Sequence, residues 1–212
     1  MGTKALIVWG GWDGHAPEAC AKLFERLLRE RDFDVRVDTT LDVFTDEDAM
    51  KAQDVVIPMW TMGDASGEQE KGICDAVASG VGIAGFHGGM CDAFRNQTQY
   101  QFMTGGQFVA HPGGIQPTYA VEVVDHEHPI TKGLGDFTMR ESEQYYMHVD
   151  PSNHVLATTT FDSGCVMPAA WTRTWGDGRV FYFSGGHTEK DFDVTEAREL
   201  TLRGIEWAAR RL

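Results

Sequence analysis

The first half of the chain alternates strand-like segments with segments of helical periodicity, and this order limits the possible folds more than any other feature. Apolar or alternating residues predict four strands, at Lys4–Trp9, Phe33–Asp38, Asp54–Trp60 and Val81–Phe86. Helical spacing, a proline in the first turn and capping residues predict three intervening helices, from Pro17 to about Arg31, around Thr45 and Asp48, and at Gly67–Ser79. The order βαβαβαβ is typical of a parallel sheet with helices on its faces.

Beyond about residue 105 the pattern indicates further strands and a closing helix. Strands are predicted at Thr118–Val124, Val155–Phe161, Ala169–Trp175 and Arg179–Ser184. Gly176-Asp177-Gly178 joins the last two and predicts a hairpin, because Asp-Gly readily adopts the positive φ angles of tight turns. An amphipathic helix is predicted from about Lys190 to Arg211. We therefore expect one α/β domain over residues 1–212, with a mostly parallel sheet flanked by helices and a C-terminal antiparallel hairpin.

The charge and composition argue against several classes of protein. The formal net charge is −14, whereas nucleic acids and anionic membranes need clustered Lys and Arg; a neutral sugar meets no such objection. No stretch of about 18 apolar residues predicts a membrane span, and the strand-like start of the chain predicts no signal peptide. The expected location is therefore the cytoplasm. The four cysteines are scattered, which indicates neither a zinc ribbon nor a disulfide framework.

The predicted strands end in glycine-rich junctions, and three of these junctions carry a histidine. In an open parallel sheet, ligands bind beyond the carboxyl ends of the strands. Those ends are Gly10–His15, Trp60–Asp64, Gly85–Gly89 and Gly185–His187. A single histidine of this kind is commonly a solvated turn residue. Three at one edge of a sheet favour a functional site.

The junction after the fourth strand has the outline of a nucleophile elbow. In Gly85-Phe86-His87-Gly88-Gly89 the residue at the tip of the tight strand-to-helix turn is His87. A serine or cysteine there would predict acyl transfer, whereas a histidine is suited to general acid–base catalysis or metal ligation. Cys91 lies inside the following helix and is poorly placed to act as the nucleophile.

An ordered set of motifs resembles the ThuA-like (trehalose utilisation) family, and it extends from residue 6 to about residue 190. The matching motifs are Gly10-Gly11-x-x-Gly14-His15, Gly85-Phe86-His87-Gly88, His111-Pro112, His128-Pro129-Ile130 with Gly133-Leu134 and Phe137, Glu143-Gln144-Tyr145, Pro168-Ala169-Ala170-Trp171, Gly178–Tyr182 and Gly186-His187. The resemblance implies a flavodoxin-like, class I glutamine-amidotransferase-like fold and a role in carbohydrate utilisation. Ser142 departs from the family, which usually has Asp at this position, and Glu141 could compensate.

The first functional hypothesis is an enzyme that acts on a sugar or an oxidised, trehalose-like glycoside by hydrolysis, elimination or isomerisation. The candidate catalytic residues are His87, His187 and Glu143, and the candidate metal ligands are His15, His87 and His111. Imidazole and carboxylate ligands suit a divalent metal such as zinc, which polarises a carbonyl or activates a bound water. The candidate substrate-binding residues are Gly11, Trp12, Asp13, Trp60, Gly88 and Tyr145.

Two other functional classes are weighed against this enzyme. A non-catalytic sugar-binding or regulatory module would have a pocket without perturbed ionisable groups, whereas the enzyme needs at least three of the five His and Glu candidates in mutual contact. A glutamine amidotransferase is disfavoured because the elbow lacks cysteine, although His187-Thr188-Glu189 keeps a His-x-Glu spacing. A homo-oligomer is a further expectation, with edge strands in the 155–184 region pairing between copies.

Overall fold

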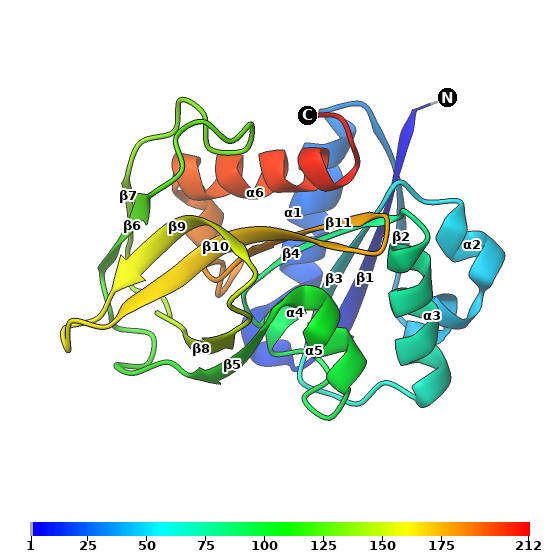
Figure 1. The fold of residues 1–212 in the computed structure, drawn as a ribbon, viewed down its shortest axis with the longest axis horizontal. Helices are drawn as coiled ribbons and strands as arrows, with labels where there is room; N and C mark the ends of the chain where they lie inside the picture. The colour runs from blue at the N-terminus through cyan, green and yellow to red at the C-terminus, as the bar shows by residue number, and fades with distance from the viewer. Residues whose placement is uncertain (1) are drawn as a thin grey trace.

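A computed structural model describes residues 2–212, and a nine-stranded sheet of order β2-β1-β3-β4-β11-β10-β9-β6-β7 forms its centre (Figure 1). Its parallel part consists of β1 (Thr3–Gly11), β2 (Phe33–Asp38), β3 (Val55–Thr61), β4 (Gly82–Phe86) and β11 (Gly178–Phe183). Its antiparallel part adds β6 (Tyr119–Val123), β7 (Phe137–Met139), β9 (His154–Thr160) and β10 (Val166–Trp175). The predicted parallel sheet and the C-terminal hairpin of β10 and β11 are confirmed.

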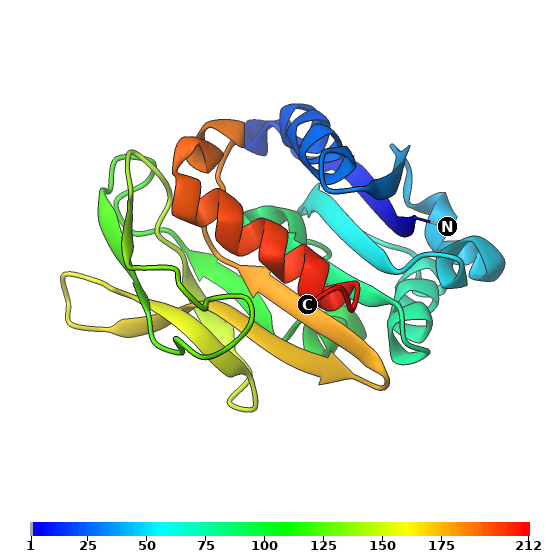
Figure 2. The ribbon, with the colours of Figure 1, turned by 90° about the horizontal axis from the view of Figure 1, so that it is seen from above.

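Helices cover both faces of this sheet. One face is covered by α1 (Pro17–Arg29) and α6 (Thr195–Ala208), which lie over the sheet when the molecule is viewed from above (Figure 2). The other face is covered by α2 (Glu47–Lys51), α3 (Gly67–Ala78), α4 (His87–Cys91), α5 (Thr98–Thr104) and a small sheet of β5 (Gly106–Ala110) and β8 (Tyr146–Val149). No helix within residues 2–212 has the length and apolar character needed to cross a membrane.

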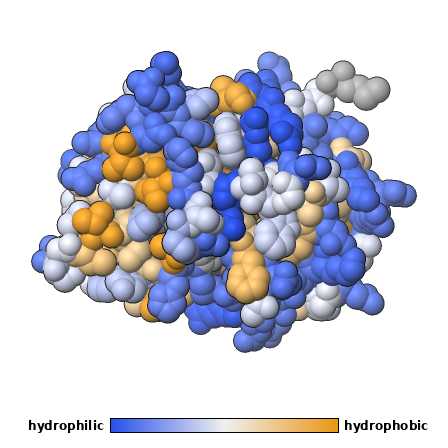
Figure 3. Space-filling view, in the orientation of Figure 1, coloured by the Kyte–Doolittle hydropathy of each residue, from blue (hydrophilic) through white to orange (hydrophobic). Residues whose placement is uncertain are grey.

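Alternation along the strands divides the core between the two faces. In β1, Ala5 and Ile7 pack toward α1 and α6, whereas Leu6 and Val8 pack toward α3 and its neighbours. Because both faces are buried, the parallel strands appear in the sequence as continuous apolar runs. In the view of Figure 3 the surface is largely hydrophilic, with apolar side chains gathered toward the end formed by β6, β9 and β10.

Two predicted helices differ in the structure. The helix expected from Lys190 to Arg211 is divided into a 3-10 turn, η3 (Glu189–Asp193), and α6, because Val194 between them is extended. The short helix expected around Thr45 follows a 3-10 turn, η2 (Leu41–Thr45), and begins at Glu47. Its cap is Asp46, which accepts a hydrogen bond from Ala49 N at 3.0 Å.

The expectation that the 155–184 region supplies an edge of the sheet is wrong. β9 and β10 are interior strands because β6 pairs with β9, and the edges of the sheet are β2 and β7. The three-residue β7 has no counterpart among the predicted strands, and it covers the outer side of β6. Pairing between copies through this region therefore has no free edge available in β9 or β10.

Candidate functional site

Four side chains from distant parts of the sequence converge at the carboxyl edge of the parallel strands. His15 ends η1 (Asp13–His15), the 3-10 turn that follows β1, His87 directly follows β4, and His187 lies just beyond β11. The segment between β7 and β8 supplies Glu143. One possible ligand atom from each of these four residues lies within 4.8 Å of the other three. We refer to His15, His87, Glu143 and His187 as the ligand cluster.

The elbow at His87 has the backbone geometry that its sequence predicts. The φ angle of His87 is 48°, a left-handed conformation that is uncommon outside glycine and concentrates at functional sites. The following residue must be glycine, because a Cβ atom on Gly88 would lie 2.6 Å from Cε1 of His15. The sharp turn therefore brings the rings of His87 and His15 together, with centroids 4.7 Å apart.

The hydrogen bonds of His87 fix which ring nitrogen carries the proton. Nδ1 lies 2.8 Å from Ser184 O, and because a carbonyl oxygen only accepts, Nδ1 donates. Nε2 lies 3.1 Å from Glu143 Oε2. Burial lowers the pKa of His87 to about 4, against the opposing effect of Glu143, so the ring is neutral at pH 7.

A neutral His87 leaves a lone pair pointing at a carboxylate. Burial acts to raise the pKa of Glu143, but its interactions with His15 and His187 hold the pKa well below its ordinary value. Glu143 is therefore ionised. Two acceptors 3.1 Å apart, Nε2 of His87 and Oε2 of Glu143, repel each other unless a cation lies between them. The arrangement therefore favours a cation at this position.

The other two histidines present nitrogen atoms to the same carboxylate. His15 Nδ1 is hydrogen-bonded to Thr61 Oγ1 at 2.8 Å, which leaves Nε2 3.6 Å from Glu143 Oε2. His187 Nδ1 lies 3.5 Å from Glu143 Oε1 and is buried without a hydrogen-bond partner among residues 2–212. The proximity of Glu143 raises the pKa of His187.

A buried carboxylate that sequence patterns do not reveal ties two of the ligand segments together. Asp191 Oδ2 accepts hydrogen bonds from Ser142 Oγ at 2.5 Å, His187 N at 2.8 Å and Gly186 N at 3.2 Å. The expected compensation for Ser142 by Glu141 is wrong, because Glu141 is exposed and Asp191 is the residue that meets Ser142. Asp191 gives no signal of its own in the sequence because it lies in η3, inside the segment predicted as one helix.

The remaining acid–base candidates lie outside the cluster. His111 is at its rim, with a side chain 39% exposed and Nε2 3.8 Å from Glu143 Oε1, and it does not belong to the converging group. Within residues 2–212, no hydrogen bond or ion pair joins Glu189 to His187, so the His-x-Glu spacing makes no triad. Burial raises the pKa of the Cys91 thiol far above its ordinary value, which makes it a poor nucleophile.

The predicted substrate-binding residues occupy three kinds of position. Trp12 is 47% exposed beside the cluster, with its ring centroid 4.8 Å from that of His15, and Gly11 and Asp13 on either side of it are also exposed. Gly88 is buried beneath His15, and Trp60 is half-buried. Tyr145 is 1% exposed and stacks on His87 at a centroid distance of 3.9 Å. Trp12 is thus the aromatic ring of this set that is open to a ligand.

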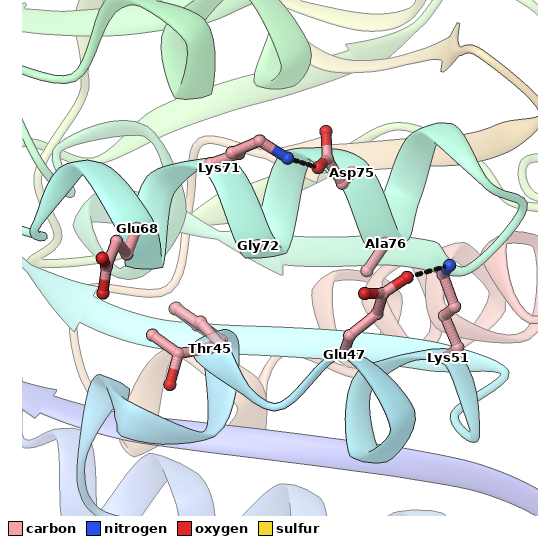
Figure 4. Close-up of a pocket in the computed structure, with 9 residues that line it drawn as sticks. Thr45, Glu47, Lys51, Glu68, Lys71, Gly72, Asp75 and Ala76 are labelled. Carbon is pink, nitrogen blue, oxygen red and sulfur yellow. Dashed lines mark hydrogen bonds and ion pairs between the residues drawn. The ribbon is translucent and has the colours of Figure 1, made fainter.

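A separate groove between η2, α2 and α3 has no such chemistry (Figure 4). Ion pairs of Lys51 with Glu47 and of Lys71 with Asp75, each one helical turn apart, lie along it. At its floor a Cβ atom on Gly72 would lie 1.8 Å from Phe44 O, so glycine lets α3 pack directly on η2. No residue of the ligand cluster lines this groove.

Comparisons with known proteins agree with the motifs and the fold. The sequence model of the ThuA family, described as trehalose utilisation, matches residues 4–208. A ThuA-like protein of Bacteroides uniformis has 22% identity and a TM-score of 0.80, covering 97% of this chain and 91% of that chain. A ThuA-like protein of Parabacteroides merdae has 20% identity and a TM-score of 0.81, covering 99% and 90%.

A third solved structure shares the fold at lower similarity. A GMP synthase protein of Thermoplasma acidophilum has 15% identity and a TM-score of 0.57, covering 98% of this chain and 96% of that chain. At these identities the similarity of the solved structures shows the fold alone. No curated protein is significantly similar to this chain.

Proposed function

This chain belongs to the ThuA (trehalose utilisation) family, and from that premise we propose that it is an enzyme that processes a sugar or an oxidised glycoside with the aid of a divalent metal ion. Family membership supports a role in carbohydrate utilisation. The ligand cluster supports the metal-assisted chemistry, with His15, His87, His187 and Glu143 as ligands.

The observation that carries the proposal is the convergence of one possible ligand atom from each of His15, His87, Glu143 and His187 within 4.8 Å of one another. His87 donates from Nδ1 to Ser184 O, so in the neutral ring Nε2 carries the lone pair, and it lies 3.1 Å from Glu143 Oε2. A divalent cation satisfies both atoms at once, together with Nδ1 of His187, which has no hydrogen-bond partner in the described part of the chain.

The spacing of the ligand atoms supports a zinc-like ion. Zinc takes four nitrogen or oxygen ligands at about 2.1 Å, so ligand atoms on a tetrahedral ion lie roughly 3.4 Å apart. The nitrogens of His87 and His15 lie 3.1 and 3.6 Å from Oε2 of Glu143, and Nδ1 of His187 lies 3.5 Å from its other oxygen, Oε1. All four ligand atoms lie within 4.8 Å of one another, so a closure of under about 1 Å brings them onto such an ion.

The surrounding residues have separate tasks in this proposal. A bound ion would supply Lewis acidity toward a sugar carbonyl or a water molecule. Trp12 offers an open aromatic face to a pyranose ring, and Asp13 lies beside it as a hydrogen-bond acceptor. His111 lies at the rim, within reach of a group bound at Glu143, and is placed to transfer a proton there.

The alternative of a non-catalytic sugar-binding module is less well supported. That hypothesis expects no perturbed ionisable groups, whereas burial moves the pKa of His87 to about 4 and Glu143 is held ionised in the interior. Perturbed groups of this kind concentrate at catalytic sites, although structural networks also produce them. The enzyme hypothesis is therefore preferred.

Metal content tests the proposal directly. Purified, tag-free protein analysed by inductively coupled plasma mass spectrometry should hold about one divalent ion per chain, and His87→Ala should lose it. His148→Ala is the matched control, because His148 is an exposed histidine on β8 outside the cluster, and it should keep the wild-type content. A wild type that neither contains a metal nor binds added Zn²⁺ would refute the metal-assisted mechanism.

A further inference from the structure

The last residue of β3, Thr61, contacts the segments that carry two histidines of the ligand cluster. Its carbonyl oxygen accepts a hydrogen bond from Trp12 N at 3.1 Å, at the start of the turn that ends in His15. Its methyl group faces the elbow, because a Cβ atom on Gly88 would lie 3.0 Å from Cγ2 of Thr61. Its hydroxyl lies 2.8 Å from Nδ1 of His15. Thr61 is 2% exposed and branched at Cβ, so these contacts leave its side chain little freedom.

The hydrogen-bond partners of His87 and His15 differ in the tautomers that they allow. Nδ1 of His87 faces the carbonyl oxygen of Ser184, which only accepts, so the neutral ring has its proton on Nδ1. Nδ1 of His15 faces a hydroxyl group, which both donates and accepts. The neutral ring of His15 can therefore carry its proton on either nitrogen. Which nitrogen carries the proton depends on the group that faces Nε2.

The surroundings of Nε2 favour a proton there when no metal is bound. Nε2 of His15 lies 3.6 Å from Oε2 of the ionised Glu143, and a lone pair on Nε2 would face this negative charge. Nδ1 then has the lone pair and accepts a hydrogen bond from the hydroxyl of Thr61. Ligation through Nε2 requires the opposite tautomer, with the proton on Nδ1 and a hydrogen-bond acceptor beside it.

We propose that Thr61 is a positioning residue of the ligand cluster, and that its hydroxyl changes from donor to acceptor when His15 becomes a metal ligand. In the metal-free protein the hydroxyl donates to Nδ1 of His15. In the loaded protein it turns about its C–O bond and accepts from Nδ1. Nε2 gives up one proton to water and Nδ1 takes one up, so the ring stays neutral. This inference rests on the proposed function, because the loaded state has a metal at the cluster.

Nuclear magnetic resonance of the intact protein labelled with ¹⁵N-histidine tests this change, because protonated and unprotonated ring nitrogens differ widely in chemical shift. The signals that are absent from His15→Gln identify His15. We expect the proton on Nε2 of His15 in chelator-treated protein, and on Nδ1 after one equivalent of Zn²⁺ is added. His87 is the internal control and should carry its proton on Nδ1 in both samples. A proton on Nδ1 of His15 before Zn²⁺ is added would overturn the proposed change.

Substitutions at Thr61 separate the effect of its hydroxyl from that of its methyl group. Thr61→Val keeps the shape but leaves Nδ1–H of the loaded His15 without an acceptor, so we expect its Zn²⁺ affinity to fall about 10- to 100-fold. Thr61→Ser keeps the hydroxyl and should keep most of the affinity. The matched control is Thr201→Val, which removes a buried hydroxyl that donates to Ala197 O within α6, and it should bind like the wild type. Equal Zn²⁺ affinities of Thr61→Val and Thr201→Val would overturn the assignment of Thr61.

The outcomes separate this inference from the proposed function. If the wild type binds no Zn²⁺, the metal-assisted mechanism fails, and the metal-free spectra still decide whether Thr61 positions His15. A shift of the Nδ1 signal of His15 in Thr61→Val, but not in Thr201→Val, supports that role. Unchanged His15 signals in Thr61→Val would overturn it whether or not the protein binds a metal.

Discussion

At the scale of single residues, the charge state of Glu143 governs the site. This carboxylate is 4% exposed, yet His15 and His187 hold its pKa well below the ordinary value. A buried charge of this kind persists only when it is paired or coordinates a metal. Its two oxygens therefore define where a cation is held, and Nε2 of the neutral His87 ring directs its lone pair at the same position.

Replacing the charge without changing the shape should remove the cation site. Glu143→Gln keeps the size of the side chain but loses a negative ligand, so we expect its Zn²⁺ affinity to fall at least about 100-fold. Competition with a chromophoric chelator measures this affinity. Glu122→Gln, an exposed position on β6, is the control. An unchanged Zn²⁺ affinity in Glu143→Gln would contradict its assignment as a ligand.

The buried ring of His87 predicts a pH dependence of stability in the metal-free protein. Its folded pKa of about 4 lies below its ordinary 6.5, so between these values the unfolded chain binds more protons. The contribution of His87 to the free energy of unfolding is fully present above about pH 6.5, and it is lost as the pH falls toward 4. It amounts to roughly 3 kcal/mol.

Urea unfolding between pH 4 and pH 7 tests the sign and the size of this contribution to the free energy of unfolding. The free energy of unfolding of the wild type should fall toward that of His87→Gln as the pH decreases. His187, whose pKa shift has the opposite sign, is common to both proteins and cancels to first order in the comparison. Parallel stability curves for the two proteins would show that His87 does not titrate in this way.

At the scale of elements, η3 positions the ligand cluster through the hydrogen bonds of Asp191. One oxygen of Asp191 accepts hydrogen bonds from the residue before Glu143 and from the backbone of His187. Groups that orient metal ligands affect metal affinity on the order of 10- to 100-fold. Asp191→Ala should therefore weaken Zn²⁺ binding by this factor. Asp191→Asn should weaken Zn²⁺ binding less, because its amide oxygen still accepts hydrogen bonds from Gly186 N and His187 N.

The matched control for Asp191→Ala is Asp193→Ala, since Asp193 is an exposed carboxylate of the same 3-10 turn. Zn²⁺ titration and melting temperature, measured together, separate loss of ligand orientation from loss of folding. If Asp191→Ala and Asp193→Ala bind Zn²⁺ equally well, Asp191 does not position the cluster.

The elements that sequence patterns predict are those stabilised by burial on both faces. β1, β3 and β4 appear as apolar runs, and the glycines after them mark the edge where His15 and His87 meet. The short β7 and the β5–β8 sheet have only three to five residues in each strand, which is too little for a periodic signal. The sequence pattern does not separate η3 from α6, because charged and apolar residues continue across Val194, where only the backbone conformation marks the break.

At the scale of the whole molecule, the cluster links segments that are far apart in the sequence. The strand order brings the ends of β1, β4 and β11 together, and the loop with Glu143 crosses over them from the antiparallel part of the sheet. The histidines could be predicted from local motifs at strand ends. The partnership of Glu143 with all of them, and of Ser142 with Asp191, depends on tertiary contacts that have no local signal.

Because the cluster joins these segments, metal binding should stabilise the whole fold. A ligand that binds only the folded state adds about 2.7 kcal/mol to the free energy of unfolding when its free concentration is 100 times its dissociation constant. For a chain of this size that corresponds to a rise in melting temperature of roughly 5–10 °C. Differential scanning calorimetry with and without Zn²⁺ should show this rise in the wild type, with reversal by a chelator, and none in His87→Ala. Equal melting temperatures with and without Zn²⁺ would count against a metal held at the cluster.

Anomalous diffraction at the zinc absorption edge, from crystals of the wild-type protein grown with Zn²⁺, tests most directly whether the ligand cluster binds a metal ion. We expect one strong anomalous peak about 2.0–2.2 Å from Nε2 of His15, Nε2 of His87, Nδ1 of His187 and a carboxylate oxygen of Glu143. A peak at another position, or none at the cluster in a fully resolved site, would contradict a metal centre held by these four residues.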